Sequence, residues 1–411
     1  MICKYLSKIL SVSILVSVIA GCALPVRQMS QKELESGFAD YTASYQEELE
    51  AAASKSRARL YYEYDKTADA TYDILVLSGG GPLGAFGAGF LQGWGQVEMA
   101  EFKRPVFDSV SGVSTGALIA PFAFVGTDEA YQDIVTLYSN PDEDLIVPRT
   151  ILAFLAGNGA YYDTSRLHER IGISITPDMV EHIAQGSRDN RVLLVGATNL
   201  DYGLMRVWDL AAIADALSFD ASHTSTTQKL IASSAIPSAF PPVEMDDYLY
   251  VDGGASMQIV SGIDDRQWLY GSKPLNLEFV KRDKPIKIRI WVIINNKLIM
   301  DPEVTSPTWS SIAQRSLFTL MRGSTLQTLQ DIETFSQMIN KLDAFDVQMQ
   351  YVAIPQHFTI PNTRRMFDKE KMLKLVELGR IMGSDPGSWQ NEALRPGAPF
   401  LAEDPLSPKP Q

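Results

Sequence analysis

The apolar run Ile74–Leu77 leads directly into a glycine-rich segment, Leu77-Ser-Gly-Gly-Gly-Pro-Leu-Gly-Ala-Phe-Gly-Ala-Gly89, in which six of thirteen residues are glycine. Glycine loses more conformational entropy on folding than any other residue. Such a cluster therefore marks a tight turn or a place where backbone amides approach a ligand closely. Two ligands fit this description. One is a phosphate at a helix N-terminus, and the other is the oxyanion of an acyl-transfer intermediate.

Apolar runs alternate with helix-like segments between Tyr72 and about Gly383. The strand-like runs are Ile74–Leu77, Val192–Val195, Met205–Trp208, Leu249–Val251, Ile286–Ile294 and Val347–Ile354. The helix-like segments are Ala85–Met99, Gly116–Phe124, Glu129–Tyr138, Thr227–Ser234, Ser310–Phe345 and Lys369–Ile381. This alternation predicts an α/β fold with a largely parallel sheet.

A second glycine-containing segment carries the pattern Gly-x-Ser-x-Gly. It reads Asp108-Ser-Val-Ser-Gly112-Val-Ser114-Thr-Gly116 and leads into a helix-like run. This order is typical of a nucleophile elbow, in which the two glycines leave room for a sharp strand-to-helix turn. The positive end of the following helix favours developing negative charge. Ser114 is therefore the predicted nucleophile.

A serine hydroxyl is a weak nucleophile unless a base takes its proton. The chain has four histidines: His168, His182, His223 and His357. Only His357, which follows a strand-like run, would complete the chain order Ser–Asp–His. Asp252 is the stronger candidate, because it ends a strand-like run and precedes Gly253 and Gly254, which let the chain turn. Desolvation there would raise the pKa of the aspartate towards neutrality and make it a base.

Taken together, four ordered segments resemble the patatin-like phospholipases. They are Gly79-Gly80-Gly81-Pro-Leu-Gly84, Gly112-Val-Ser114-Thr-Gly116, Ala232-Ser-Ser-Ala-Ile-Pro237-Ser-Ala-Phe-Pro-Pro242 and Asp252-Gly253-Gly254. The resemblance covers a catalytic core over residues 73–262. Residues 263–385 are similar to the family only in their alternation of strands and helices. We assign them to the C-terminal part of the same α/β domain.

The resemblance implies a three-layer sandwich, with helices on both sides of a mostly parallel sheet, and a serine acyl hydrolase of the lipase or phospholipase A type. It implies that Ser114 is the nucleophile and Asp252 its proton acceptor, in a dyad without histidine. The amides of Gly79, Gly80 and Gly81 are implied to form the oxyanion hole. Leu83 departs from the family, since many relatives carry Arg or Lys there, and this leaves a preference for anionic phospholipid open.

Three other hypotheses about the function remain open. The first is a Ser–His–Asp esterase that uses His357. The second is dinucleotide binding, since Gly79-x-Gly81-x-x-Gly84 satisfies that fingerprint and Glu98 or Glu101 lies near the spacing of a ribose-binding acid, although this leaves Ser114 unexplained. The third is a catalytically weak lipoprotein that uses the fold as a binding or assembly module. No Walker lysine and no metal-ligand spacing is present, so we expect no cofactor and no metal.

The N-terminus has the features of a lipoprotein signal peptide over residues 1–21. Its apolar run, Ile9–Ala20, is too short to span a bilayer comfortably as a helix. The run ends in Ile19-Ala-Gly-Cys22, which resembles a bacterial lipobox in which Cys22 is lipidated. Several acyl chains would anchor the protein stably. Ala23, in place of aspartate, resembles the outer-membrane pattern, so we expect a membrane-anchored lipoprotein that faces the periplasm or lies at the cell surface.

The overall charge and the chain ends complete these expectations. A formal net charge of −13 over 411 residues, without a basic cluster, argues against nucleic-acid binding. Residues 22–72 are polar and are predicted to be a tether with some helix. Residues 386–411 are rich in Pro, Gly and acidic residues and are predicted to be a loose tail. The expected partners are a membrane and a lipid or other acyl-ester substrate.

Overall fold

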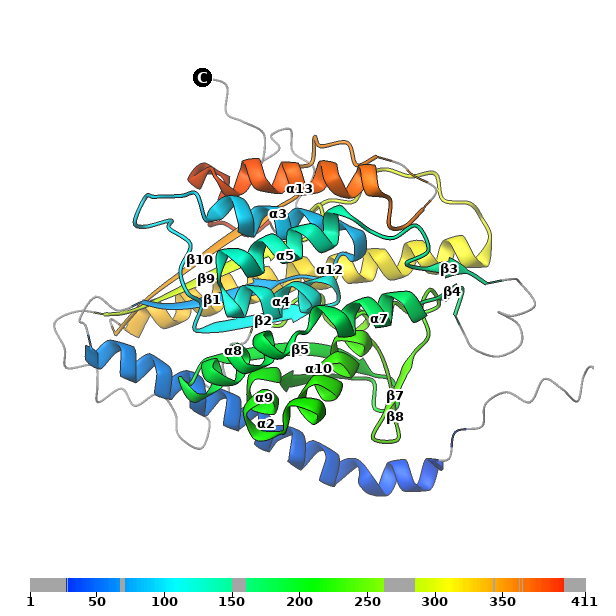
Figure 1. Ribbon diagram of the computed structural model, residues 1–411, viewed down its shortest axis with the longest axis horizontal. Coiled ribbons are helices and arrows are strands. Elements are labelled where there is room, and N and C mark those ends of the chain that lie inside the picture. The colour runs from blue at the N-terminus through cyan, green and yellow to red at the C-terminus, as the bar shows by residue number, and fades with distance from the viewer. Residues whose placement is uncertain are drawn as a thin grey trace, which may run out of the picture.

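The computed structural model describes residues 27, 29–66, 71–149, 160–261, 285–342, 344–361, 363 and 365–394. Within these residues, an eight-stranded sheet lies between two layers of helices (Figure 1). Its parallel strands are, in spatial order, β10 (Phe345–Ala353), β9 (Ile286–Ile294), β1 (Thr71–Leu77), β2 (Ser109–Val113) and β5 (Val192–Asn199). The antiparallel strands are β6 (Leu204–Asp209), β7 (Val243–Met245) and β8 (Tyr248–Asp252). The predicted α/β fold with a mostly parallel sheet is confirmed.

Helices cover both faces of this sheet. One face packs against α3 (Gly84–Trp94), α4 (Thr115–Val125), α5 (Asp128–Ser139), α7 (Ser165–Ser174), α8 (Pro177–Arg188), α9 (Leu210–Ala216), α10 (Phe219–Ser233) and α13 (Lys369–Gly383). The other face packs against α2 (Gln31–Lys66) and α12 (Trp309–Ile339). The short strands β3 (Val147–Pro148) and β4 (Tyr162–Asp163) pair antiparallel in a separate two-stranded sheet.

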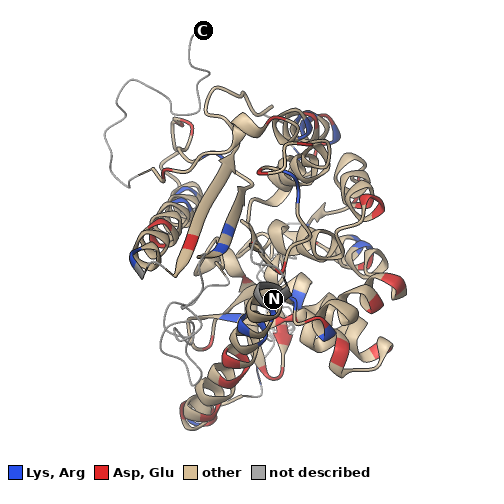
Figure 2. Cartoon of the chain, turned by 90° about the vertical axis from the view of Figure 1, so that its left-hand side faces the viewer, with Lys and Arg blue, Asp and Glu red and all other residues tan. Residues whose placement is uncertain are grey.

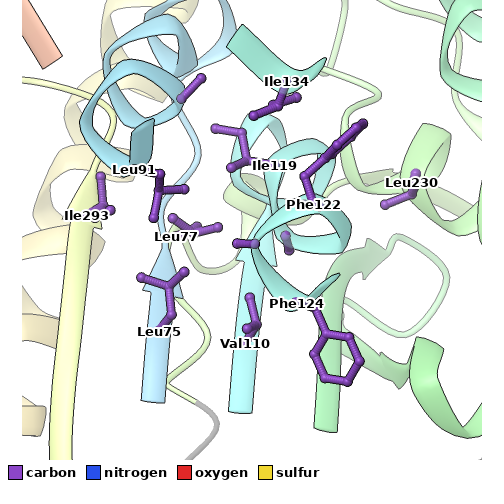
Figure 3. Close-up of a cluster of buried hydrophobic side chains, with 14 of the residues drawn as sticks. Leu75, Leu77, Leu91, Val110, Ile119, Phe122, Phe124, Ile134, Leu230 and Ile293 are labelled. Carbon is purple, nitrogen blue, oxygen red and sulfur yellow. The ribbon is translucent and has the colours of Figure 1, made fainter. Parts of the chain in front are cut away.

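The side chains of β1 show why this strand lies at the centre. Successive side chains of a strand point to opposite faces, and here both faces are buried. Tyr72, Ile74 and Val76 join the core beneath α12, whereas Leu75 and Leu77 join the core beneath α3 and α4. Figure 3 shows Leu75 and Leu77 among side chains from the neighbouring strands and helices. A continuous apolar run is therefore the expected signature of this strand.

The predicted tether is different in the structure, because residues 31–66 form one helix, α2, that packs along the sheet. Ala52, Ala53 and Leu60 are buried on its inner side. Arg59 Nε donates to Asp108 Oδ1 at 2.8 Å, and Glu48 accepts Arg206 Nη2 at 2.7 Å. Aromatic contacts add to these interactions, since the ring centroids of Tyr41 and Tyr202 lie 4.6 Å apart. The sequence predicted a tether because this segment has a low hydrophobicity.

Side chains of both charges are spread over the helices. Figure 2 shows Lys and Arg interspersed with Asp and Glu in that view, rather than gathered on one element.

The C-terminal tail begins later than predicted. Trp389 is buried, and its ring centroid lies 4.8 Å from that of Trp94 and 4.9 Å from that of Trp291. The main chain of Gln390 exchanges two hydrogen bonds with Tyr351 of β10. Residues 386–394 therefore belong to the folded body.

Residues 1–26 and 395–411 lie outside the described residues, and with them the predicted signal peptide, Cys22 and the rest of the tail. The described helices include none with the length and apolarity needed to cross a bilayer.

Candidate active site

Two loops meet at the carboxyl ends of the neighbouring parallel strands β1 and β2. Leu77 pairs with Gly112 in the register of these strands, so the glycine-rich turn after β1 and the elbow after β2 leave the sheet side by side. A Cβ atom placed on Gly79 would lie 3.3 Å from Ser114 Cβ. Open α/β sheets usually bind ligands at this edge. The two glycine segments noted in the sequence thus face one site.

Ser114 occupies a strained backbone position between β2 and α4. Its φ of 55° and ψ of −125° lie outside the regions that a residue with a side chain normally adopts. A side chain at Gly116 would be impossible, because its Cβ would lie 2.3 Å from the Leu77 carbonyl oxygen. This is the sharp strand-to-helix turn that the sequence predicts, and it presents Ser114 at the N-terminus of α4.

Asp252 reaches Ser114 through the arrangement of strands around β5. β6 pairs with β5 over Leu194–Asn199 and occupies one edge. β8 pairs with the last residues of β5 and must therefore share the other edge with β2. Val113 of β2 pairs with Gly196, and Asp252 of β8 pairs with the next residue, Ala197. The end of β2 and the end of β8 therefore meet at one point.

At this point the two side chains are in direct contact. Ser114 Oγ donates to Asp252 Oδ2 at 2.5 Å. Both residues are buried, with exposures of 4% and 1%. Desolvation by burial raises the pKa of Asp252 to about 6, although the hydroxyl of Ser114 and the N–H of Gly254, 2.7 Å from Oδ1, act in the opposite direction. A carboxylate with this pKa can accept a proton near neutral pH.

The glycine-rich turn offers two backbone amides to the site. Gly80 and Gly81 line the cavity beside Ser114, and among the described residues their N–H groups have no acceptor. Gly81 has φ +55°, a conformation that favours glycine. The Gly79 N–H instead donates to Gln258 O at 3.1 Å. The prediction that Gly79 supplies an oxyanion donor therefore does not fit this geometry.

Two cavities of different character meet at Ser114. The wider one, of about 630 Å³, is lined by polar and apolar groups, including Gly80, Asp252 and Arg322. The narrower one, of about 90 Å³, is lined by residues of α4, α5 and α7 among others and is mostly apolar. Its walls include Leu118, Phe122, Ile171, Ile236, Phe240 and Phe367. Gly81, Ser114 and Ile236 border both cavities. A bound ester could therefore place its two halves in chemically different surroundings.

The histidines lie elsewhere. His168 contacts Thr164, and the rings of His182 and His223 contact backbone carbonyl oxygens of residues 178 and 172. His357 is exposed in the turn after β10, and it lines neither cavity. No histidine contact to Ser114 or Asp252 occurs in the described part of the chain. The same residues contain no group of three His, Cys, Asp or Glu side chains that could hold a metal ion.

Sequence reasoning did not identify the group that holds the elbow in place. Ser233, at the end of α10, accepts the Ser114 N–H at 2.9 Å and donates its hydroxyl to Gly196 O at 2.6 Å. Two residues later, the Ala235 carbonyl accepts the Asp252 N–H at 2.8 Å. Both residues lie in the segment Ala232–Pro242, which contributed to the family resemblance. The sequence did not show that this segment forms hydrogen bonds to Ser114 and Asp252.

Residues 75–260 match the family described as patatin-like phospholipase. The chain contains a patatin-like phospholipase domain. This domain spans the glycine-rich turn, the elbow and the strand that ends in Asp252.

Among solved structures, VipD from Legionella pneumophila resembles this chain with 12% sequence identity and a TM-score of 0.33, over 78% of this chain and 68% of that one. No curated protein sequence matches.

Proposed function

We propose that this patatin-like protein is a serine acyl hydrolase that cleaves ester-linked acyl chains of lipids through a Ser114–Asp252 dyad. The observation that carries the proposal is the direct contact between Ser114 Oγ and Asp252 Oδ2 at the junction of the two cavities. Membership of the patatin-like family supports the reaction class.

In the first half of the proposed reaction, Asp252 takes the hydroxyl proton as Ser114 Oγ attacks the ester carbonyl carbon. The carbonyl oxygen becomes an oxyanion, for which the free N–H groups of Gly80 and Gly81 are the available donors. Collapse of this intermediate expels the alcohol, which takes the proton from Asp252, and leaves an acyl-enzyme. Water then repeats the sequence and releases the fatty acid.

The two cavities support a division of the substrate. The narrow apolar cavity suits the acyl chain, because burial of each CH₂ group contributes about 0.8 kcal/mol. The wider cavity contains charged and polar groups and suits the alcohol part of the ester. A lipid with an apolar chain and a polar alcohol portion matches both.

Analysis of lipid products tests the proposed function. Purified wild type and Ser114→Ala are incubated with mixed bacterial phospholipids, and released fatty acid and lysolipid are measured. We expect products only from wild type, and a fluorophosphonate probe should label wild type alone. A folded wild type that releases no fatty acid and takes up no probe would favour a binding or assembly role instead.

We propose in addition that the mature protein is a lipoprotein attached through Cys22 to a membrane, the outer membrane or the cell surface. The support is the sequence Ile19-Ala-Gly-Cys22 after an apolar run. Such an anchor would keep the active site close to its lipid substrate.

A further inference from the structure

Among the described residues, four basic side chains line the wide cavity beside Ser114: Lys297, Arg315, Arg322 and Lys371. Two of them are neutralised. Lys297 Nζ binds both carboxylate oxygens of Asp301 at 2.8 Å, and Arg315 Nη1 binds Glu303 Oε2 at 2.9 Å. Arg322 and Lys371 form no side-chain hydrogen bond and no ion pair with any residue that the structure describes.

Arg322 lies on the side of α12 that faces the cavity. Its Nη1 is inaccessible to solvent and has no hydrogen-bond partner within the described residues. Burial lowers the pKa of Arg322 to about 10, and the charge of Asp301 only partly opposes this effect. Both oxygens of Asp301 are already bound to Lys297. A guanidinium nitrogen that is buried without an acceptor is unfavourable, so an anion entering the cavity would stabilise Arg322.

Lys371 lies in the first turn of α13, which contacts the turn Gly81–Leu83. Only 9% of the residue is exposed, yet it lines the cavity together with Leu83 and Met366. Burial lowers the pKa of Lys371, and Asp368 is the acid whose charge acts against this shift. Leu83, which lines the same cavity, is apolar and carries no charge. Lys371 of α13 brings a positive charge to this cavity.

We propose that Arg322 and Lys371 form an anion subsite for the phosphate group of the lipid alcohol. This proposal rests on the proposed function, since it takes Ser114 as the point of ester cleavage. If the acyl chain fills the apolar cavity, the alcohol part extends into the wide cavity, where these two cations lie. Guanidinium and ammonium groups bind phosphate oxygens through charge-assisted hydrogen bonds. The subsite favours glycerophospholipids over neutral glycerides.

The test compares a phospholipid with a diacylglycerol of the same acyl chains, each in the same detergent micelles. The kcat/KM values are measured for wild type, Arg322→Gln, Lys371→Gln and Lys371→Arg. Lys374→Gln is the matched control, because Lys374 lies on the same helix but is exposed and paired with Glu370. Circular dichroism and the rate of fluorophosphonate labelling check that each variant keeps its fold and its Ser114 site.

We expect the ratio of phospholipid to diacylglycerol kcat/KM to fall by about tenfold to a hundredfold in each Gln variant, as for loss of a charged hydrogen bond. Lys371→Arg should retain most of the ratio, and Lys374→Gln all of it. An unchanged ratio in both Gln variants would overturn the subsite, and so would equal losses on both lipids. If wild type hydrolyses neither lipid, the proposed function fails instead.

Inorganic phosphate distinguishes the source of the anion. Added to the diacylglycerol assay, it should leave the rate unchanged if the subsite serves the lipid phosphate. A change in rate with added phosphate that disappears in Arg322→Gln and Lys371→Gln would assign the site to free phosphate and overturn the proposal.

Discussion

Ser114 and Asp252 lie 138 residues apart in the chain, yet their side chains touch because Val113 and Asp252 pair with adjacent residues of β5. Main-chain pairing in the sheet therefore brings the two side chains together. Substitutions that preserve shape at either residue should therefore leave the strand pairing of the sheet intact.

The first prediction separates the dyad from a triad. Asp252→Asn keeps the shape of the side chain but removes the proton acceptor, so activity should fall by roughly the 10²–10⁴-fold that general-base catalysis supplies. His357→Ala should change activity by less than about threefold, which is under 1 kcal/mol of barrier. Initial rates on one lipid substrate test both. A hundredfold loss in a well-folded His357→Ala would refute the dyad and favour the Ser–His–Asp alternative.

The second prediction concerns the pH dependence of activity. Since burial raises the pKa of Asp252 to about 6, its carboxylate form is lost as the pH falls through this value. The kcat/KM should therefore be level above about pH 7 and fall about tenfold per pH unit below about pH 6. A neutral ester that does not titrate in this range is the suitable substrate. A level profile down to about pH 5 would contradict the role of Asp252 as base.

The same pKa predicts an effect on stability. The folded state binds the Asp252 proton more tightly than the unfolded state, so this stabilisation is fully present below the unfolded pKa of 3.8 and is lost as the pH rises through about 6. Near pH 8 the ionised, buried carboxylate costs up to about 3 kcal/mol, which Asp252→Asn removes. Urea unfolding should show the variant more stable than wild type near pH 8, with little difference near pH 4. A less stable variant at the higher pH would contradict this.

Much of the fold and of the Ser114–Asp252 pair could be predicted because their signals are local. Strands such as β9 are continuous apolar runs, and the elbow and the turn after Asp252 are marked by glycines. The docking of α2 could not be predicted, since it depends on partners such as Asp108 that are distant in the chain. The same holds for Gly79, whose amide is occupied by the carbonyl of Gln258 from another loop.

A third prediction tests the support of the elbow. Ser233→Ala leaves the buried N–H of Ser114 without its acceptor, which should cost about 1–3 kcal/mol of unfolding free energy and lower kcat about tenfold. Ser222→Ala is the matched control. Ser222 is also buried on α10, but within the described residues its hydroxyl donates only to the carbonyl of Phe219 in the same helix. Equal effects of the two substitutions on kcat would show that Ser233 has no special role in positioning Ser114.

A fourth prediction follows from the proposed anchor. Replacing Cys22 by Ala removes the thiol to which lipid would be attached, so the protein should leave the membrane fraction. Cell fractionation and mass spectrometry of the mature N-terminus measure the change. Wild type that keeps an N-terminus upstream of Cys22 and carries no lipid would show that the lipoprotein assignment is wrong.

The last prediction tests which cavity holds the acyl chain. Leu118 lies one helical turn after Ser114 and lines the narrow apolar cavity, so Leu118→Trp should block it beyond the first few carbons of a chain. Overpacking of this kind costs about 1–3 kcal/mol, and the cost falls only on chains long enough to reach the indole. The ratio of kcat/KM for a long-chain ester to that for a short-chain ester should therefore fall about tenfold or more. Phe318→Trp is the control, because Phe318 lines the wide cavity and is partly exposed. If Phe318→Trp lowered this ratio and Leu118→Trp did not, the acyl chain would have to lie in the wide cavity, and the division of the substrate proposed above would be reversed.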